Sequence, residues 1–148
     1  MCLLKIIDSH CPPYAETIAY KVMQRVSWNN TYCSPYFGTP FGDSQFGTWV
    51  LDGSAKVLRC SSHPYQSYER GFHCLKSKDL AFALAKGISR QHAGAEMVVC
   101  EVMLRQLTAV GVEHVLKKEE VVAATVFVAA EIKFLRVVPE EELSNVTD

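Results

Sequence analysis

The chain lacks an excess of charge of either sign. Its 148 residues include 15 basic and 16 acidic side chains, which gives a formal net charge of -1. A protein that binds nucleic acid non-specifically normally carries a basic excess, so we expect no nucleic-acid partner. Hydrophobic residues make up 49% and charged residues 21% of the chain. These values are typical of a folded globular domain and exclude general disorder.

Long apolar runs are also lacking. The longest candidate, residues 121–138, is interrupted by Glu131 and Lys133. The apolar stretch near the N-terminus is broken by Lys5 and closed by Asp8, which makes it too short for the core of a signal peptide. Spanning a bilayer takes about 20 apolar residues. We therefore expect a cytoplasmic protein with no membrane partner.

The six cysteines, at positions 2, 11, 33, 60, 74 and 100, form no Cys-x-x-Cys pair. A chain of this length without a secretory signal builds its core without disulfides, so we expect free thiols. A zinc site from Cys60, His63, His73 and Cys74 is the alternative, but adjacent side chains on a strand point to opposite faces. We predict no metal and no cofactor.

The motifs of common catalytic machinery are missing. The chain contains no Gly-x-Ser-x-Gly elbow, no phosphate-loop pattern and no His-Glu-x-x-His pair. Cys33 and Cys74 are candidate nucleophiles, but each would need a nearby base or positive charge to lower its pKa. The sequence assigns no catalytic residue and favours a non-enzymatic protein.

The patterns that are present predict an α+β fold, a single compact domain over residues 1–138 with an acidic tail at 139–148. We expect a mostly antiparallel, twisted sheet. Its strands are predicted from alternation and β-branched content, at residues 18–26, 71–75, 95–104, 108–116 and, as one bent strand or two, 121–138. A charged turn is expected at 117–120.

Other elements are predicted from capping and turn signals. Ser77 is a good N-cap for a main helix over residues 77–91, with an apolar stripe of Leu80, Leu84 and Ile88. Pro13 suits the first turn of a short helix over 12–19. Asp52-Gly53 predicts a hairpin between 48–51 and 56–60. Residues 60–70 look polar and turn-like.

Residues 27–47, the aromatic loop, hold six aromatic side chains, two prolines and three glycines. We expect little regular structure there, and loops of this length are usually functional or disordered. Aromatic side chains stack on bases and nicotinamide-like rings, but they also form ordinary cores and interfaces. Both readings of the loop stay open.

His73 comes at the end of a predicted strand, just before the main helix. If the strand alternates, Phe72 and Cys74 point to one face and His73 to the other. His73 would then face a phosphate or carboxylate near the positive helix end, or would hold the loop by a hydrogen bond to the backbone. Together with the aromatic loop, this gives a candidate ligand-binding set: Tyr32, Tyr36, Trp49, Arg70, His73 and Lys76.

Several short segments carry a resemblance: Gly71-Phe72-His73-Cys74, Tyr20-Lys21-Val22, Ser34-Pro35-Tyr36, Phe46-Gly47-Thr48-Trp49, Ala81 with Ala85, and Val98-Val99-Cys100-Glu101-Val102. With them the chain resembles a loose group of small, mostly uncharacterised phage and bacterial proteins. The resemblance implies a small α+β phage protein in the host cytoplasm. The chain is also distantly similar to ADP-ribosyltransferases. That likeness implies an enzyme that uses NAD, with His73 and Tyr36 in the pocket and Glu131 as the charged group.

The sequence thus favours a non-enzymatic binding module. It would be a phage accessory or anti-defence protein that sequesters a nucleotide-derived small molecule or blocks a host protein. One alternative is the NAD-using enzyme. A second alternative is an oligomeric structural or interaction protein, because an exposed edge at 121–138 would suit strand pairing between subunits; we expect a homo-oligomer.

Overall fold

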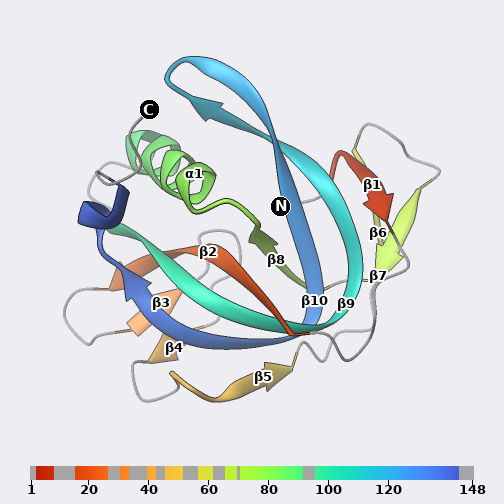
Figure 1. Cartoon of the computed structure of the whole chain (residues 1–148), viewed down its shortest axis with the longest axis horizontal. Coiled ribbons are helices and arrows are strands. Elements are labelled where there is room, and N and C mark those ends of the chain that lie inside the picture. The colour runs from red at the N-terminus through yellow and green to blue at the C-terminus, as the bar shows by residue number, and fades with distance from the viewer. Residues whose placement is uncertain are drawn as a thin grey trace.

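The computed structural model of the chain describes residues 3–8, 16–26, 31–33, 40–42, 46–51, 57–61, 66–69, 71–91 and 96–143. Its elements along the chain are β1 (Lys5–Asp8), β2 (Thr17–Val26), β3 (Thr31–Cys33), β4 (Pro40–Gly42), β5 (Trp49–Leu51), β6 (Val57–Arg59), β7 (Ser67–Glu69), β8 (Phe72–Leu75), α1 (Lys78–Gln91), β9 (Glu96–Lys117), β10 (Glu120–Val138) and the 3-10 helix η2 (Glu140–Leu143). The predicted α+β class, with one main antiparallel sheet and one main helix, is confirmed (Figure 1).

The main sheet has eight strands in the order β1-β9-β10-β8-β2-β3-β4, with β5 attached to β10. Strand β9 also pairs with β2, and the Tyr20–Leu75 pair joins β8 to β2. The strands β2, β9, β10 and β8 therefore form a ring in which each pairs with the next. Strands β6 and β7 form a separate two-stranded sheet.

Strands β9 and β10 form one long, curved hairpin that runs through the whole molecule (Figure 1). Alternating valines and other β-favouring residues sustain its length. Gln106, with φ 56°, interrupts the regular backbone of β9, and the register between the two strands shifts at Val128/Ala129. The two strands expected at 95–104 and 108–116 are thus a single bent strand. The charged turn is confirmed, with positive φ at Lys118 and Glu119, as two-residue hairpin turns require.

Helix α1 begins as the sequence predicts. The Ser77 hydroxyl accepts a hydrogen bond from the Leu80 amide at 3.3 Å, which satisfies one of the free donors of the first turn. The buried face of α1 consists of Ala81, Phe82, Ala85 and Ile88. It is rotated from the predicted stripe, since Leu80 and Leu84 are only partly buried.

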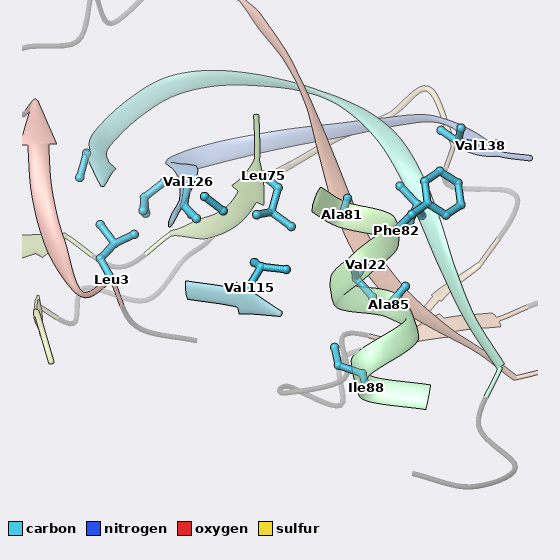
Figure 2. Close-up of a cluster of buried hydrophobic side chains, with 14 of the residues drawn as sticks. Leu3, Val22, Leu75, Ala81, Phe82, Ala85, Ile88, Val115, Val126 and Val138 are labelled. Carbon is cyan, nitrogen blue, oxygen red and sulfur yellow. The ribbon is translucent and has the colours of Figure 1, made fainter. Parts of the chain in front are cut away.

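The core consists of two clusters on opposite sides of the central strands. The helix-side cluster contains the buried face of α1 together with Val22 and Val138 (Figure 2). Val99 belongs to the same cluster. The far-side cluster contains Met23 and Cys100, the strand neighbours of Val22 and Val99, with Leu104, Ile132 and Phe134 further along. Adjacent residues of one strand enter different clusters because strand side chains alternate. Both sides of the central strands are therefore buried.

Several local predictions are wrong. Strand β5 pairs with β10, and β6 pairs with β7, so 48–51 and 56–60 do not pair with each other; distant partners replace the local hairpin. Residues 17–19, expected at the end of a short helix, belong to β2, where pairing with β9 overrides the helical signal; residues 12–15 lie outside the described part. The aromatic loop contains β3 and β4, which pair, and residues 60–70 contain β7.

The acidic tail is partly structured. Residues 140–143 form η2. Glu142 pairs with Arg136 at 2.7 Å and with Lys78 at 3.5 Å, and Arg136 also pairs with Glu101. These ion pairs attach η2 to β10 and to the start of α1. In the described part of the chain, no helix has the length and apolar character needed to cross a membrane.

Candidate binding surface

His73 lies in the interior with its ring bonded on both sides. The side chain is 8% exposed. Its Nδ1 lies 3.1 Å from the Gly71 carbonyl oxygen, and its Nε2 lies 2.9 Å from the Tyr68 hydroxyl. A carbonyl only accepts, so Nδ1 carries the proton, and in the neutral ring Nε2 accepts from the Tyr68 hydroxyl. The Tyr68 oxygen in turn accepts the Leu3 amide at 2.9 Å. The two ring contacts are to Gly71 and Tyr68, neither of which belongs to the aromatic loop that His73 was considered to hold.

The environment of Cys74 disfavours the thiolate form that a nucleophile needs. Cys74 is 1% exposed, and burial raises its pKa to about 11, although Lys21 acts in the opposite direction. The Lys21 ammonium donates a hydrogen bond to the His73 carbonyl at 3.1 Å. A thiol with a raised pKa stays protonated at neutral pH.

The zinc alternative finds no support in the geometry of His73 and Cys74. Cys74 belongs to the far-side cluster, whereas His73 bonds to Tyr68 of the helix-side cluster. Within the described residues, no three His, Cys, Asp or Glu side chains gather into a group that could hold a metal ion. His63 lies outside those residues.

Tyr32 forms part of the core. It is 2% exposed, and its ring lies 5.7 Å from that of Phe46, which lies 6.0 Å from that of Phe134. Of the other predicted ligand contacts, Lys76 is exposed between β8 and α1. Tyr36 and Arg70 lie outside the described residues. The structure does not bring Tyr32, His73 and Lys76 together around one opening.

Trp49 is the predicted contact that lies on a charged surface. The Arg105 guanidinium carbon lies 3.9 Å from the centroid of the Trp49 ring, and the Lys133 ammonium lies 5.0 Å away. Glu131 accepts two hydrogen bonds from Arg105, at 2.8 and 3.1 Å. This two-point pairing fixes the guanidinium plane over the indole ring.

Register places these side chains on one side of four adjacent strands. In one row across β2, β9, β10 and β5, Ile18 pairs with Met103, Met103 with Lys133, and Lys133 with Trp49. The next row on the same side contains Arg105, Glu131 and Leu51, with Glu16 close enough to interact with Arg105. We call this set the exposed sheet face: Glu16, Ile18, Trp49, Leu51, Met103, Arg105, Glu131 and Lys133.

The intervening row confirms the orientation. Leu104 and Ile132, which lie between the two rows, are fully buried in the far-side cluster, and Val50 packs against them. The exposed sheet face therefore points away from that cluster. Its outer apolar members, Leu51 and Ile18, are 63% and 42% exposed, whereas its central members are half-buried: Trp49, Met103, Arg105, Glu131 and Lys133.

The Arg105–Glu131 ion pair at the centre of the face stabilises the charged form of both side chains. The hydrogen bonds from Arg105 lower the pKa of Glu131 below its ordinary value, and those to Glu131 raise the pKa of Arg105. Glu131, the charged group in the NAD-using alternative, is thus an ionised partner of Arg105. That position lies on a different strand and in a different environment from the hydrogen-bonded ring of His73.

Trp49 and Glu131 are the members of the face that the sequence indicated as candidate site residues; the other members were not predicted. Alternation around Met103 and around Lys133, where polar or long side chains are flanked by apolar ones, would have marked these strand segments as exposed on one side. Nothing in the sequence pattern indicates that they lie beside β5.

Comparisons with protein families, with curated proteins and with solved structures found no match for this chain. The resemblances to small phage proteins and to ADP-ribosyltransferases therefore stay predictions.

Proposed function

We propose that this chain is a non-enzymatic interaction module that binds a protein partner through the exposed sheet face. The observation that carries the proposal is the composition of that face. Trp49, Leu51, Met103 and Ile18 surround an ordered Arg105–Glu131 pair on four adjacent strands. Tryptophan, methionine and arginine are enriched in protein interfaces, and tryptophan and arginine dominate their binding energy.

The charges of the face favour a protein over a free anion. Arg105 and Lys133 are accompanied by Glu131 and Glu16, so positive and negative charge balance. A phosphate would meet these carboxylates, whereas a protein surface can present charges of both signs to match them. Such a module would suit an accessory protein that acts by occupying a host protein, which is the role that the resemblance to phage proteins implies.

The environments of the side chains that could act in catalysis support a non-enzymatic role. His73 has both ring nitrogens engaged in hydrogen bonds, and burial keeps the Cys74 thiol protonated. Glu131 is engaged by Arg105. None of these described groups is poised as a general base or nucleophile, since His73 and Glu131 would first have to break hydrogen bonds and Cys74 would have to ionise in the interior.

Site-specific photo-crosslinking tests the proposal. A benzophenone amino acid is placed at Leu51, 63% exposed, and in a matched control at Val121, which is 67% exposed on the β9–β10 hairpin. Irradiation of cells that express the chain should give a defined protein adduct from position 51 and a much weaker one from position 121. Equal or absent adducts at both positions would contradict the proposal.

A nucleotide-like ligand is the second candidate, favoured by the two cations beside the Trp49 ring. A base could stack on the indole while Lys133 meets a phosphate. Titration of adenine nucleotides and NAD against tryptophan fluorescence, with Trp49→Leu as control, would reveal such binding. Release of nicotinamide during the NAD titration would instead favour the enzymatic alternative.

A further inference from the structure

The exposed sheet face has the symmetry of a self-complementary surface. We infer that its partner is a second copy of this chain, packed face to face about a two-fold axis that runs parallel to the strands between β9 and β10. The inference rests on the proposed function, because it names the protein that the face binds. It goes further by fixing which residues of the two copies meet.

The axis follows from the strand register. The face has β2 and β5 at its two sides and β9 and β10 in the middle. A two-fold axis between β9 and β10 exchanges β9 with β10 and β2 with β5. Residues of the same row then oppose each other across the interface. Two sheets whose strands run in nearly the same direction are a standard packing arrangement.

This operation sets opposite charges against each other. Arg105 and Glu131 occupy the same row on β9 and β10, so Arg105 of one copy meets Glu131 of the other. Each copy already holds this pair at 2.8 Å. The two pairs together form a square of alternating charges, in which every guanidinium lies between two carboxylates. Such a network retains pairing for both ions when water is excluded.

The same operation sets one apolar pair together, and it also sets Glu16 of one copy against Leu51 of the other, because both lie in the row of Arg105 and Glu131. Ile18 on β2 and Trp49 on β5 belong to one row, so Ile18 of one copy meets the indole of the other. Met103 meets Lys133, whose aliphatic stem packs on apolar neighbours while its ammonium stays in solvent. Isologous interfaces require this match of a patch with itself.

The size of the face predicts weak association. A stable interface of standard size uses roughly 20–30 residues a side, and the exposed sheet face supplies far fewer. The dimer should therefore form at high protein concentration and dissociate on dilution.

Two charge-reversal variants test the pairing of Arg105 with Glu131 directly. Arg105→Glu makes the centre of the face negative, and Glu131→Arg makes it positive.

Sedimentation equilibrium of the whole chain provides the readout. We expect the unmodified chain to pass from monomer to dimer with concentration, each variant alone to stay monomeric, and an equimolar mixture of the two variants to dimerise again. Ile18→Ser, which introduces no like charges within one copy, should also weaken the dimer several-fold. Circular dichroism checks that every variant folds.

Other results would overturn the inference. An unmodified chain that stays monomeric up to its solubility limit excludes a second copy as the partner. Variants that dimerise as well as the unmodified chain would place the dimer contact elsewhere. If the chain is monomeric but position 51 crosslinks to a different protein, only this inference fails; if that position also gives no adduct, the proposed function fails with it.

Discussion

Buried polar atoms of His73 and Glu113 have opposite hydrogen-bonding environments. His73 belongs to a chain in which the Leu3 amide donates to Tyr68 and Tyr68 donates to His73. Glu113 on β9 has a buried Oε1 atom without a hydrogen-bond partner among the described residues. A buried polar group costs free energy unless it is paired. The first arrangement should stabilise the fold and the second should destabilise it.

Tyr68→Phe tests the first arrangement. The change removes the hydroxyl that serves both Leu3, which is fully buried, and His73. Two buried groups lose a partner, so we expect the free energy of unfolding to fall by about 1–3 kcal/mol. Urea denaturation measures the loss. Ser67→Ala, an exposed neighbour on β7, is the control and should change little; equal stability of the two variants would argue against the hydrogen-bonded chain.

Glu113→Gln tests the second arrangement through pH. Burial raises the pKa of Glu113 from 4.5 to about 7, although the positive charge of the N-terminus acts in the opposite direction. Between these values the folded chain keeps a proton that the unfolded chain has released. Stability therefore falls as pH rises through this window, and the penalty is complete above about pH 7.

The expected effect of Glu113→Gln is a flatter pH profile. At about pH 8 the variant should be more stable by about 1–2 kcal/mol, a value reduced for the partial exposure of the side chain. At about pH 5 the two proteins should differ little. Urea denaturation at both pH values decides the matter, and an unchanged pH dependence in the variant would show that Glu113 is not responsible.

At the scale of the elements, strand β1 packs closely on β9 at Gly111. Gly111 on β9 lies opposite Ile6 of β1. A Cβ atom there would lie 2.5 Å from the Lys5 carbonyl oxygen and 2.6 Å from a Leu3 side-chain carbon. Any larger residue must push β1 away from the sheet. Gly87, in α1, provides a contrast, since a Cβ atom there would have no neighbour within 4 Å.

The two glycines give a paired prediction. Gly111→Ala should lower the free energy of unfolding by about 1–3 kcal/mol, because the added methyl group would overpack the contact between β9 and β1. Gly87→Ala should raise it by about 0.5–1 kcal/mol, because alanine favours the helix. Thermal and urea denaturation of both variants would check the signs. A neutral Gly111→Ala would show that β1 is not closely docked.

Elements specified by neighbouring residues could be predicted from the sequence, and those specified by distant ones could not. The start of α1 depends on Ser77 and the residues directly after it, and the turn at Lys118 depends on the two long strands beside it. The pairing of β5 with β10 joins residues about 80 positions apart in the chain. Asp52-Gly53 offered a local hairpin instead, and tertiary pairing overrode it.

The same limit applies to the candidate surface at the scale of the whole molecule. Trp49 could be selected as an aromatic contact, and the opposite directions of His73 and Cys74 could be predicted from alternation. The position of Arg105 over Trp49 could not, because it depends on β5 and β9 each pairing with β10. The exposed sheet face exists only in the assembled sheet, and so does the interaction function proposed for it.

Hydroxyl-radical footprinting tests most directly whether this face is the interaction surface. The purified chain is oxidised when dilute and when concentrated, and also inside producing cells. Mass spectrometry then compares Trp49, Met103 and Leu51 with Leu116, which is 53% exposed on the β9–β10 hairpin. We expect the three face residues to become protected in the concentrated sample and in cells, while Leu116 stays reactive. Unchanged reactivity of the face under all three conditions would contradict it.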